Sequence, residues 1–147
     1  MADLPDAILF SCTMNAVRSP MAEGIMKHYF GHKVYVDSVG VRQGEISAFV
    51  VTIMEEIGID LSQHSPKTFD QLEDTSYDLV ISLSPDAQHR AVELTRVMAC
   101  ELEYWQTFDA TLIQGSRDRI LDAYREVRDS LQNLILKRFS DGSPPTA

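Results

Sequence analysis

"FSCTMNAVRSPMAEG", residues 10–24, joins the end of one predicted element to the start of the next. The run "DAILFS" (6–11) is short, apolar and bounded by polar residues, which is typical of a strand buried on both faces. Beyond the arginine, Ser19 is a good N-cap, Pro20 is a good first helical residue, and Gly31 is a suitable helix stop. We therefore expect a strand, a tight loop and a helix in direct succession.

The remaining sequence continues this alternation of strands and helices. The runs that predict further strands are "KVYVDS" (33–38), "YDLVISL" (77–83) and "MACELEY" (98–104). Apolar residues at helical spacing predict helices at 47–58, 84–97 and about 116–139. Ser47 and Ser84 are the expected N-caps of the first two of these three helices. The fold class is therefore α/β, a single domain over residues 1–139 with a four-stranded parallel sheet flanked by helices on both faces. The end of the chain, "SDGSPPTA" (140–147), is expected to be a flexible C-terminal tail.

The composition excludes several classes of partner. A formal net charge of −9, with 13 scattered Lys and Arg residues, argues against nucleic-acid and membrane partners. The N-terminal "MADLPDAILF" lacks the basic region of a signal peptide, which favours a cytoplasmic location. In that compartment the 2 cysteines are not expected to form a disulfide, and the 4 histidines have no metal-ligand spacing. We expect neither a metal nor a cofactor.

The loop between the first strand and the first helix is expected to be a phosphate-binding loop. Its backbone N–H groups and the helix start can surround an oxyanion, while a guanidinium can bind two of the oxygens. The residues expected to bind the substrate phosphate are Thr13, Met14, Asn15, Ala16, Val17 and Arg18. Cys12 would then be a nucleophile at the floor, because a nearby guanidinium and helix N-terminus favour a thiolate. A cysteine that closes an apolar strand is also a common core residue, and Met14 and Val17 can instead point away into packing.

Several stretches of the chain resemble one family. "ILFSCTMNAVRSPMAEG" (8–24), with "VDSVG", "GIDLSQHSPK", "YDLVISLS" and "YWQTFDA", is similar to the low-molecular-weight protein tyrosine phosphatases and to the arsenate reductases that share their fold. The resemblance implies a low-molecular-weight phosphatase domain that uses a cysteinyl-phosphate intermediate and no metal. It implies that Cys12 is the nucleophile, Arg18 the phosphate clamp, and Ser19 the hydroxyl that hydrogen-bonds the thiolate. It also implies a buried network that supports the loop, formed by Asn15, Ser38 and His64.

Hydrolysis of a phosphate ester also needs an acid for the leaving oxygen. Asp109 lies in "YWQTFDATLIQG" (104–115), the longest segment without regular periodicity, where a mobile loop can close over the phosphate. The resemblance implies that Asp109 protonates the leaving alcohol and then accepts a proton from the attacking water. Trp105 and Phe108 beside it either form a wall of the cleft or anchor the loop.

The loop departs from the family pattern at two positions. Met14 stands where many relatives have glycine, so a positive φ at this residue would strain the loop. Val17 stands where many relatives have a second cysteine. Oxidised Cys12 would therefore lack a neighbouring thiol with which to form a disulfide.

Two further departures concern the substrate and the reductase reaction. Asp109 is followed by Ala110 and Thr111, not by proline and aromatic residues, so the tyrosines that stack on an aromatic substrate are absent. Ser84 and Ala91 stand where the thioredoxin-coupled arsenate reductases have their two relay cysteines. That relay is therefore not expected in this chain.

The residues and the resemblance together predict a phosphomonoester hydrolase, specifically a protein tyrosine phosphatase. Its expected substrate is a phosphorylated protein or a small phosphomonoester, with inorganic phosphate or arsenate as competing ligands. One alternative is an arsenate reductase that uses an external small thiol. The other is a non-catalytic oxyanion-binding module.

Overall fold

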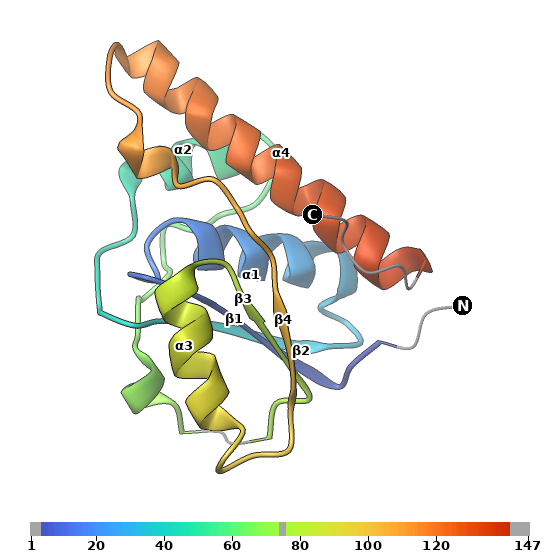
Figure 1. Cartoon of the computed structure of the whole chain (residues 1–147). Helices are drawn as coiled ribbons and strands as arrows, with labels where there is room; N and C mark the ends of the chain where they lie inside the picture. The colour runs from blue at the N-terminus through green and yellow to red at the C-terminus, as the bar shows by residue number, and fades with distance from the viewer. Residues whose placement is uncertain (1–3, 74–75, 142–147) are drawn as a thin grey trace.

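A four-stranded parallel sheet forms the centre of the computed structural model, which describes residues 4–73 and 76–141 (Figure 1). Its strands are β1 (Ala7–Cys12), β2 (Tyr35–Gly40), β3 (Leu79–Ser82) and β4 (Glu101–Tyr104). Their spatial order is β2-β1-β3-β4, with every neighbouring pair parallel. The predicted α/β fold with a parallel four-stranded sheet is thus confirmed.

Helices cover both faces of this sheet. The longer helices are α1 (Arg18–Phe30), α2 (Ala48–Glu55), α3 (Pro85–Leu94) and α4 (Arg117–Asp141). α4 packs against α1 and α2 on one face, while α3 packs on the other face against β1 and β3 (Figure 1). Two short 3-10 helices, η1 (Phe69–Gln71) and η2 (Ala110–Leu112), lie in the connecting segments.

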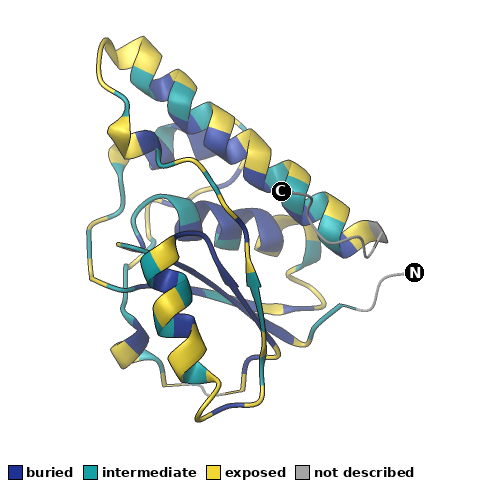
Figure 2. Cartoon of the chain, in the orientation of Figure 1, coloured by how far each residue is buried: buried dark blue, intermediate teal, exposed yellow. Residues whose placement is uncertain are grey.

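β1 is the strand that both layers bury. Ile8, Phe10 and Cys12 belong to the core cluster that includes α1 and α4 residues. Ala7 and Leu9 belong to the smaller cluster on the α3 side. This alternation follows from the two-residue side-chain period of a strand, and it explains why the run is apolar throughout. In Figure 2 the central strands β1 and β3 are accordingly dark blue, whereas the edge strand β4 is intermediate and exposed, and exposed residues lie on the outer sides of the helices.

The ends of several elements differ from the sequence expectation. β2 ends two residues later than expected, because Val39 and Gly40 pair with Ser11 and Cys12 of β1. β4 is shorter than the apolar run suggested and begins only at Glu101. The predicted N-caps of α2 and α3, Ser47 and Ser84, are at their expected positions.

α4 packs along the outer layer through one apolar stripe. Its buried residues are Leu121, Tyr124, Val127, Leu131, Ile135 and Phe139. The helix continues through Ser140 and Asp141 into the stretch predicted as a tail, and residues 142–147 lie outside the described residues. In the described part of the chain, no helix has the length and apolar character needed to cross a bilayer.

Ion pairs join α4 to the end of α2. The Glu56 carboxylate, directly after α2, accepts hydrogen bonds from Arg125 at 2.8 Å and from Arg128 at 2.8 Å. These bonds, first Arg125 and then Arg128, lower the pKa of Glu56 from 4.5 to about 2.

The two cysteines lie at opposite ends of the strands of the sheet. Cys12 is the last residue of β1, whereas Cys100 directly precedes β4. Because the strands are parallel, Cys12 is at their carboxyl ends and Cys100 at their amino ends. In open α/β sheets, ligands bind at the carboxyl ends of the strands, at the point where successive crossover connections diverge. In this sheet that point lies between the neighbouring strands β1 and β3.

Candidate active site

A small cavity of about 150 Å³ lies at the carboxyl end of β1. It is lined by Cys12, Thr13, Met14, Ala16, Val17, Arg18, Asp109 and Thr111. We call residues 12–18 the cradle loop and residues 105–112 the acid segment. A cavity of this volume has room for a tetrahedral oxyanion. The structure thus brings the predicted nucleophile, clamp and acid around one space.

Cys12 is held by hydrogen bonds from the start of α1. Its Sγ lies 2.9 Å from Ser19 Oγ and accepts a longer hydrogen bond, 3.4 Å, from the Ser19 backbone N–H. Ser19 Oγ accepts from Asn15 Nδ2, and its one proton can be donated to the sulfur at 2.9 Å or to the Val39 carbonyl at 3.4 Å. Both donors stabilise negative charge on Sγ.

Ser19 therefore does not cap the helix, and the predicted N-cap is wrong. α1 begins one residue earlier, at Arg18, with Val17 in the N-cap position and no side-chain cap hydrogen bond. Ser19 lies in the first turn, where its hydroxyl bonds the sulfur and not a helical N–H group. The loop geometry, which brings Cys12 back against the helix start, creates this partner.

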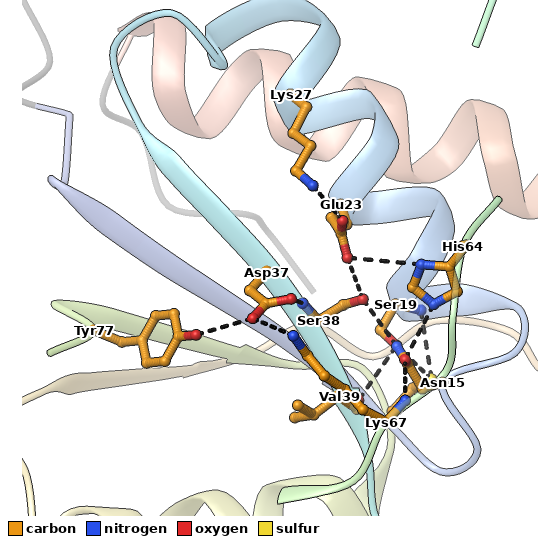
Figure 3. A network of polar contacts seen from close by, with 11 residues as sticks. Asn15, Ser19, Glu23, Lys27, Asp37, Ser38, Val39, His64, Lys67 and Tyr77 are labelled. Carbon is orange, nitrogen blue, oxygen red and sulfur yellow. Dashed lines mark hydrogen bonds and ion pairs between the residues drawn. The ribbon is translucent and has the colours of Figure 1, made fainter. Parts of the chain in front are cut away.

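Asn15 shapes the cradle loop from within. It is fully buried, and among the described residues it is the single non-glycine residue with positive φ, at 54°. Its Nδ2 donates to Ser19 Oγ at 2.8 Å and to Ser38 Oγ at 2.9 Å. Its Oδ1 accepts from the Lys67 backbone N–H at 3.0 Å and lies 3.1 Å from His64 Nε2 (Figure 3). The predicted grouping of Asn15, Ser38 and His64 is thus present in the structure.

The network continues away from the loop along α1 and β2. Ser38 Oγ donates to the Glu23 carboxylate, which also accepts from Lys27 Nζ (Figure 3). Burial lowers the pKa of His64 below its ordinary value, although the Glu23 carboxylate opposes this shift. A neutral His64 donates through Nε2, because Asn15 Oδ1 can only accept. Sequence reasoning missed Glu23, although it lies four residues after Ser19 and therefore on the same helix face.

A second carboxylate supports the network from β2. Asp37 Oδ2 accepts from Lys67 Nζ at 2.6 Å and from Tyr77 Oη at 3.1 Å (Figure 3). Lys67 thus bonds Asn15 through its backbone and Asp37 through its side chain. A larger cavity of about 580 Å³ borders this side of the network, but no residue of the cradle loop lines it.

The guanidinium of Arg18 is oriented by backbone carbonyls. Nη1 donates to the Leu83 carbonyl at 2.9 Å and to the Thr107 carbonyl at 3.3 Å. Within the part of the chain that the structure describes, Nε and Nη2 have no hydrogen-bond partner. These two nitrogens form the edge of the guanidinium that can bind two oxygens of an oxyanion.

Asp109 lines the cavity from the acid segment. Its Oδ1 accepts from the Thr111 backbone N–H at 3.0 Å and from the Thr111 hydroxyl at 2.6 Å. Because both bonds go to Oδ1, a proton on this carboxyl is carried more readily by Oδ2. Trp105 is buried and packs edge-on against Phe10, so it anchors the segment, whereas Phe108 is 51% exposed.

Met14 and Val17 both line the cavity, and Val17 also packs against the core cluster. Positive φ occurs at Asn15 and not at Met14. The replacement of the family's glycine by Met14 therefore does not strain the backbone of the loop. Gly44 lies against Met14, where an added Cβ would be 3.1 Å from the Met14 Cβ.

Thr13 links the cradle loop to the start of α3. Its hydroxyl donates to Asp86 Oδ1 at 2.8 Å and lies 3.2 Å from Ser84 Oγ. Burial opposes ionisation of Asp86, but hydrogen bonds from Ser84, Thr13 and Ala87 lower its pKa below the ordinary value. Sequence reasoning missed Asp86, because its contact with Thr13 joins residues 73 positions apart. No group of three or more potential metal ligands occurs among residues 4–73 and 76–141.

Residues 7–138 match the family model described as "Low molecular weight phosphotyrosine protein phosphatase". The chain belongs to this family. Members of this phosphatase family and its relatives carry more than one named activity. The arsenate reductase of Bacillus subtilis (strain 168) is 32% identical over 134 residues, which cover 91% of this chain and 94% of that protein.

Two solved structures that are similar to this chain also have different named activities. A low molecular weight protein tyrosine phosphatase from T. tengcongensis has a TM-score of 0.72 and 26% identity, covering 92% of this chain and 98% of that one. A mutant of the arginine phosphatase YwlE with a phosphorylated active site serine has a TM-score of 0.72 and 25% identity, covering 92% and 94% of the two chains.

Proposed function

We propose that this member of the low molecular weight phosphatase family hydrolyses phosphomonoesters through Cys12. One observation carries the proposal: Cys12 Sγ faces two Ser19 donors and shares a 150 Å³ cavity with Arg18 and Asp109. A nucleophile, an oxyanion clamp and a proton donor are the three groups that this reaction needs.

In the first step, Sγ attacks the phosphorus while the bond to the leaving oxygen breaks. Nε and Nη2 of Arg18 and the backbone N–H groups of the cradle loop bind the phosphoryl oxygens. Asp109 gives its proton to the leaving oxygen, so the alcohol departs neutral. The product on the enzyme is a cysteinyl phosphate.

In the second step, water attacks the phosphorus and gives a proton to Asp109. The S–P bond breaks and the electron pair returns to Sγ. The Ser19 hydroxyl, 2.9 Å from Sγ, stabilises the departing thiolate. Inorganic phosphate leaves, and Cys12 is ready for another cycle.

The proposed substrates are aryl phosphates, and the proposed partner is a protein that carries phosphotyrosine. The family to which the chain belongs and the burial of Cys12, which is 3% exposed, support this choice, since a planar aryl group allows the phosphoryl group to reach a buried nucleophile. Inorganic phosphate and arsenate are proposed as competing ligands. A nucleophilic thiol must stay reduced, which supports a cytoplasmic location.

The names of the relatives favour a second candidate, arsenate reduction. Arsenate has the tetrahedral shape of phosphate and would occupy the same cavity on Cys12. Ser84, with its hydroxyl 3.2 Å from the Thr13 hydroxyl, and buried Ala91 stand in place of relay cysteines. Two external small thiols would therefore have to supply the two electrons and end as a disulfide, while arsenate becomes arsenite and its lost oxygen leaves as water.

One set of assays decides among these functions. We expect hydrolysis of p-nitrophenyl phosphate that Cys12→Ser abolishes, with Cys100→Ser as the matched control that retains it. Thiol-dependent consumption of arsenate without phosphatase turnover would instead support the reductase. Binding of phosphate with neither reaction would leave a non-catalytic oxyanion-binding module.

A further inference from the structure

The carbonyl oxygen of Leu83, directly after β3, accepts two hydrogen bonds from the candidate site. Arg18 Nη1 donates to it at 2.9 Å, and the Thr107 hydroxyl donates to it at 3.0 Å. Arg18 Nη1 also donates to the Thr107 carbonyl at 3.3 Å. The clamp, the end of β3 and the acid segment therefore form a closed set of three contacts.

Thr107 lies between the two buried anchors of the acid segment. On one side, buried Trp105 donates its backbone N–H to the Ser82 carbonyl at 2.9 Å. On the other side, Ala110 is fully buried at the start of η2. Asp109 stands two residues beyond Thr107, on the part of the segment between these anchors.

Leu83 is itself fixed to the strand that carries the nucleophile. Its backbone N–H donates to the Ser11 carbonyl at 2.8 Å, one residue before Cys12. The hydrogen bond from the Thr107 hydroxyl to the Leu83 carbonyl thus fixes the position of the acid segment relative to the end of β1.

We propose that Thr107 is a positioning residue that sets the distance between the Asp109 carboxyl and the phosphoryl group held by Arg18. The inference rests on the proposed hydrolysis and adds to it a residue outside the predicted site. Protonation requires the acid within hydrogen-bond reach of the leaving oxygen, and a displacement of about 1 Å can cost up to about a hundredfold in rate. Esters with poor leaving groups depend on that proton, whereas esters with good leaving groups need it much less.

The test compares two aryl phosphates in Thr107→Val, which keeps the shape of threonine but removes the hydroxyl. We expect kcat/KM for phenyl phosphate to fall about tenfold, and kcat/KM for p-nitrophenyl phosphate to fall less than about threefold. Thr107→Ser restores the hydroxyl and is expected to bring phenyl phosphate back to within about twofold. Inhibition by inorganic phosphate is expected to change less than about twofold, because the bond from Arg18 to Leu83 remains.

Thr52→Val is the matched control. The Thr52 hydroxyl also donates to a backbone carbonyl, that of Ala48 at 3.0 Å, but it lies exposed in α2. Its removal is expected to leave the ratio of the two kcat/KM values unchanged.

Equal slowing of both esters by Thr107→Val, or failure of Thr107→Ser to rescue phenyl phosphate, would overturn the inference while leaving the proposed function intact. Absence of hydrolysis in the unaltered chain, or hydrolysis that survives Cys12→Ser, would overturn the proposed function and this inference with it.

Discussion

The cradle loop and the acid segment line the same cavity, but different kinds of contact hold them. Asn15 and Ser19 are fully buried, and their polar side-chain atoms are bonded to other buried or half-buried groups. In the acid segment, Phe108 is 51% exposed and Leu112 is 70% exposed. The Asp109 carboxyl bonds its own near neighbour Thr111.

This difference separates binding from proton transfer. A cradle made of buried and mutually bonded polar groups is formed before any oxyanion arrives, so little has to be reorganised on binding. A carboxyl on an exposed segment can adjust to leaving groups of different size. Substitutions of the buried cradle residues should therefore affect both stability and chemistry, whereas substitutions of the acid-segment residues outside its buried anchors, such as Asp109, should affect chemistry alone.

The largest effect is expected from Arg18→Lys. A lysine is a point charge that cannot bind two oxygens in parallel or reach both carbonyls, so we expect kcat/KM to fall between about 100- and 1,000-fold. Steady-state kinetics with p-nitrophenyl phosphate measure the loss. Arg90→Lys, in which the arginine pairs with Asp70 and Glu93 on the outer side of α3, is the matched control. A loss below tenfold would show that the backbone N–H groups alone bind the oxyanion.

Asp109→Asn tests the acid segment directly. We expect about a hundredfold loss in kcat/KM for phenyl phosphate and only a few-fold loss for p-nitrophenyl phosphate, because the amide cannot donate a transferable proton. The midpoint of urea unfolding should stay unchanged, since Asp109 is not part of the buried network. A similar loss for both esters would mean that another group supplies the proton.

Asn15→Ala tests the cradle loop as a structural unit. It leaves the partners of Asn15 unsatisfied and places an alanine at positive φ, so we expect a loss of about 3 kcal/mol in the free energy of unfolding. Urea unfolding followed by circular dichroism measures this change, with exposed Asn133→Ala as the matched control. Equal stability of the two variants would contradict the importance of the network.

The smallest effect is expected from Glu56→Gln, which lies outside both regions. The pKa of Glu56 is about 2 in the folded chain and 4.5 as its ordinary value, so its ion pairs stabilise the fold above pH 4.5. This contribution is lost as the pH falls from 4.5 towards 2. Because the group is partly exposed, we expect less than about 1 kcal/mol at pH 7.

Urea unfolding of both proteins across this pH range measures that difference. The two curves should converge at low pH, and kcat/KM should be the same at pH 7. A change in kcat/KM would show that the outer helical layer is coupled to the cavity.

Much of the fold could be predicted because its signals are local. The apolar run of β1, the serine caps of α2 and α3, and the spacing of Cys12 and Arg18 can all be recognised within a few residues. These signals were sufficient for the order of elements and for most of the residues around the cavity.

The errors and omissions arise from contacts between distant parts of the chain. Ser19 has the pattern of an N-cap, but the folded loop gives its hydroxyl a sulfur partner. Thr107 and Asp86 have no local signal, because their partners come from other strands and loops. The boundary of β2 depends on its pairing with β1, which no run of residues within β2 specifies.

The separation of the two cysteines determines how the chain would respond to oxidative stress. Measured along the strand direction, Cys12 and Cys100 are about five residues, or roughly 16 Å, apart in the sheet. A disulfide needs Cα atoms within about 7 Å of each other. Burial also raises the pKa of the Cys100 thiol, which makes it a poor attacking group. Cys12 oxidised by peroxide therefore has no second thiol in its own molecule with which to form a disulfide. Recovery of activity would depend on reducing thiols in its surroundings.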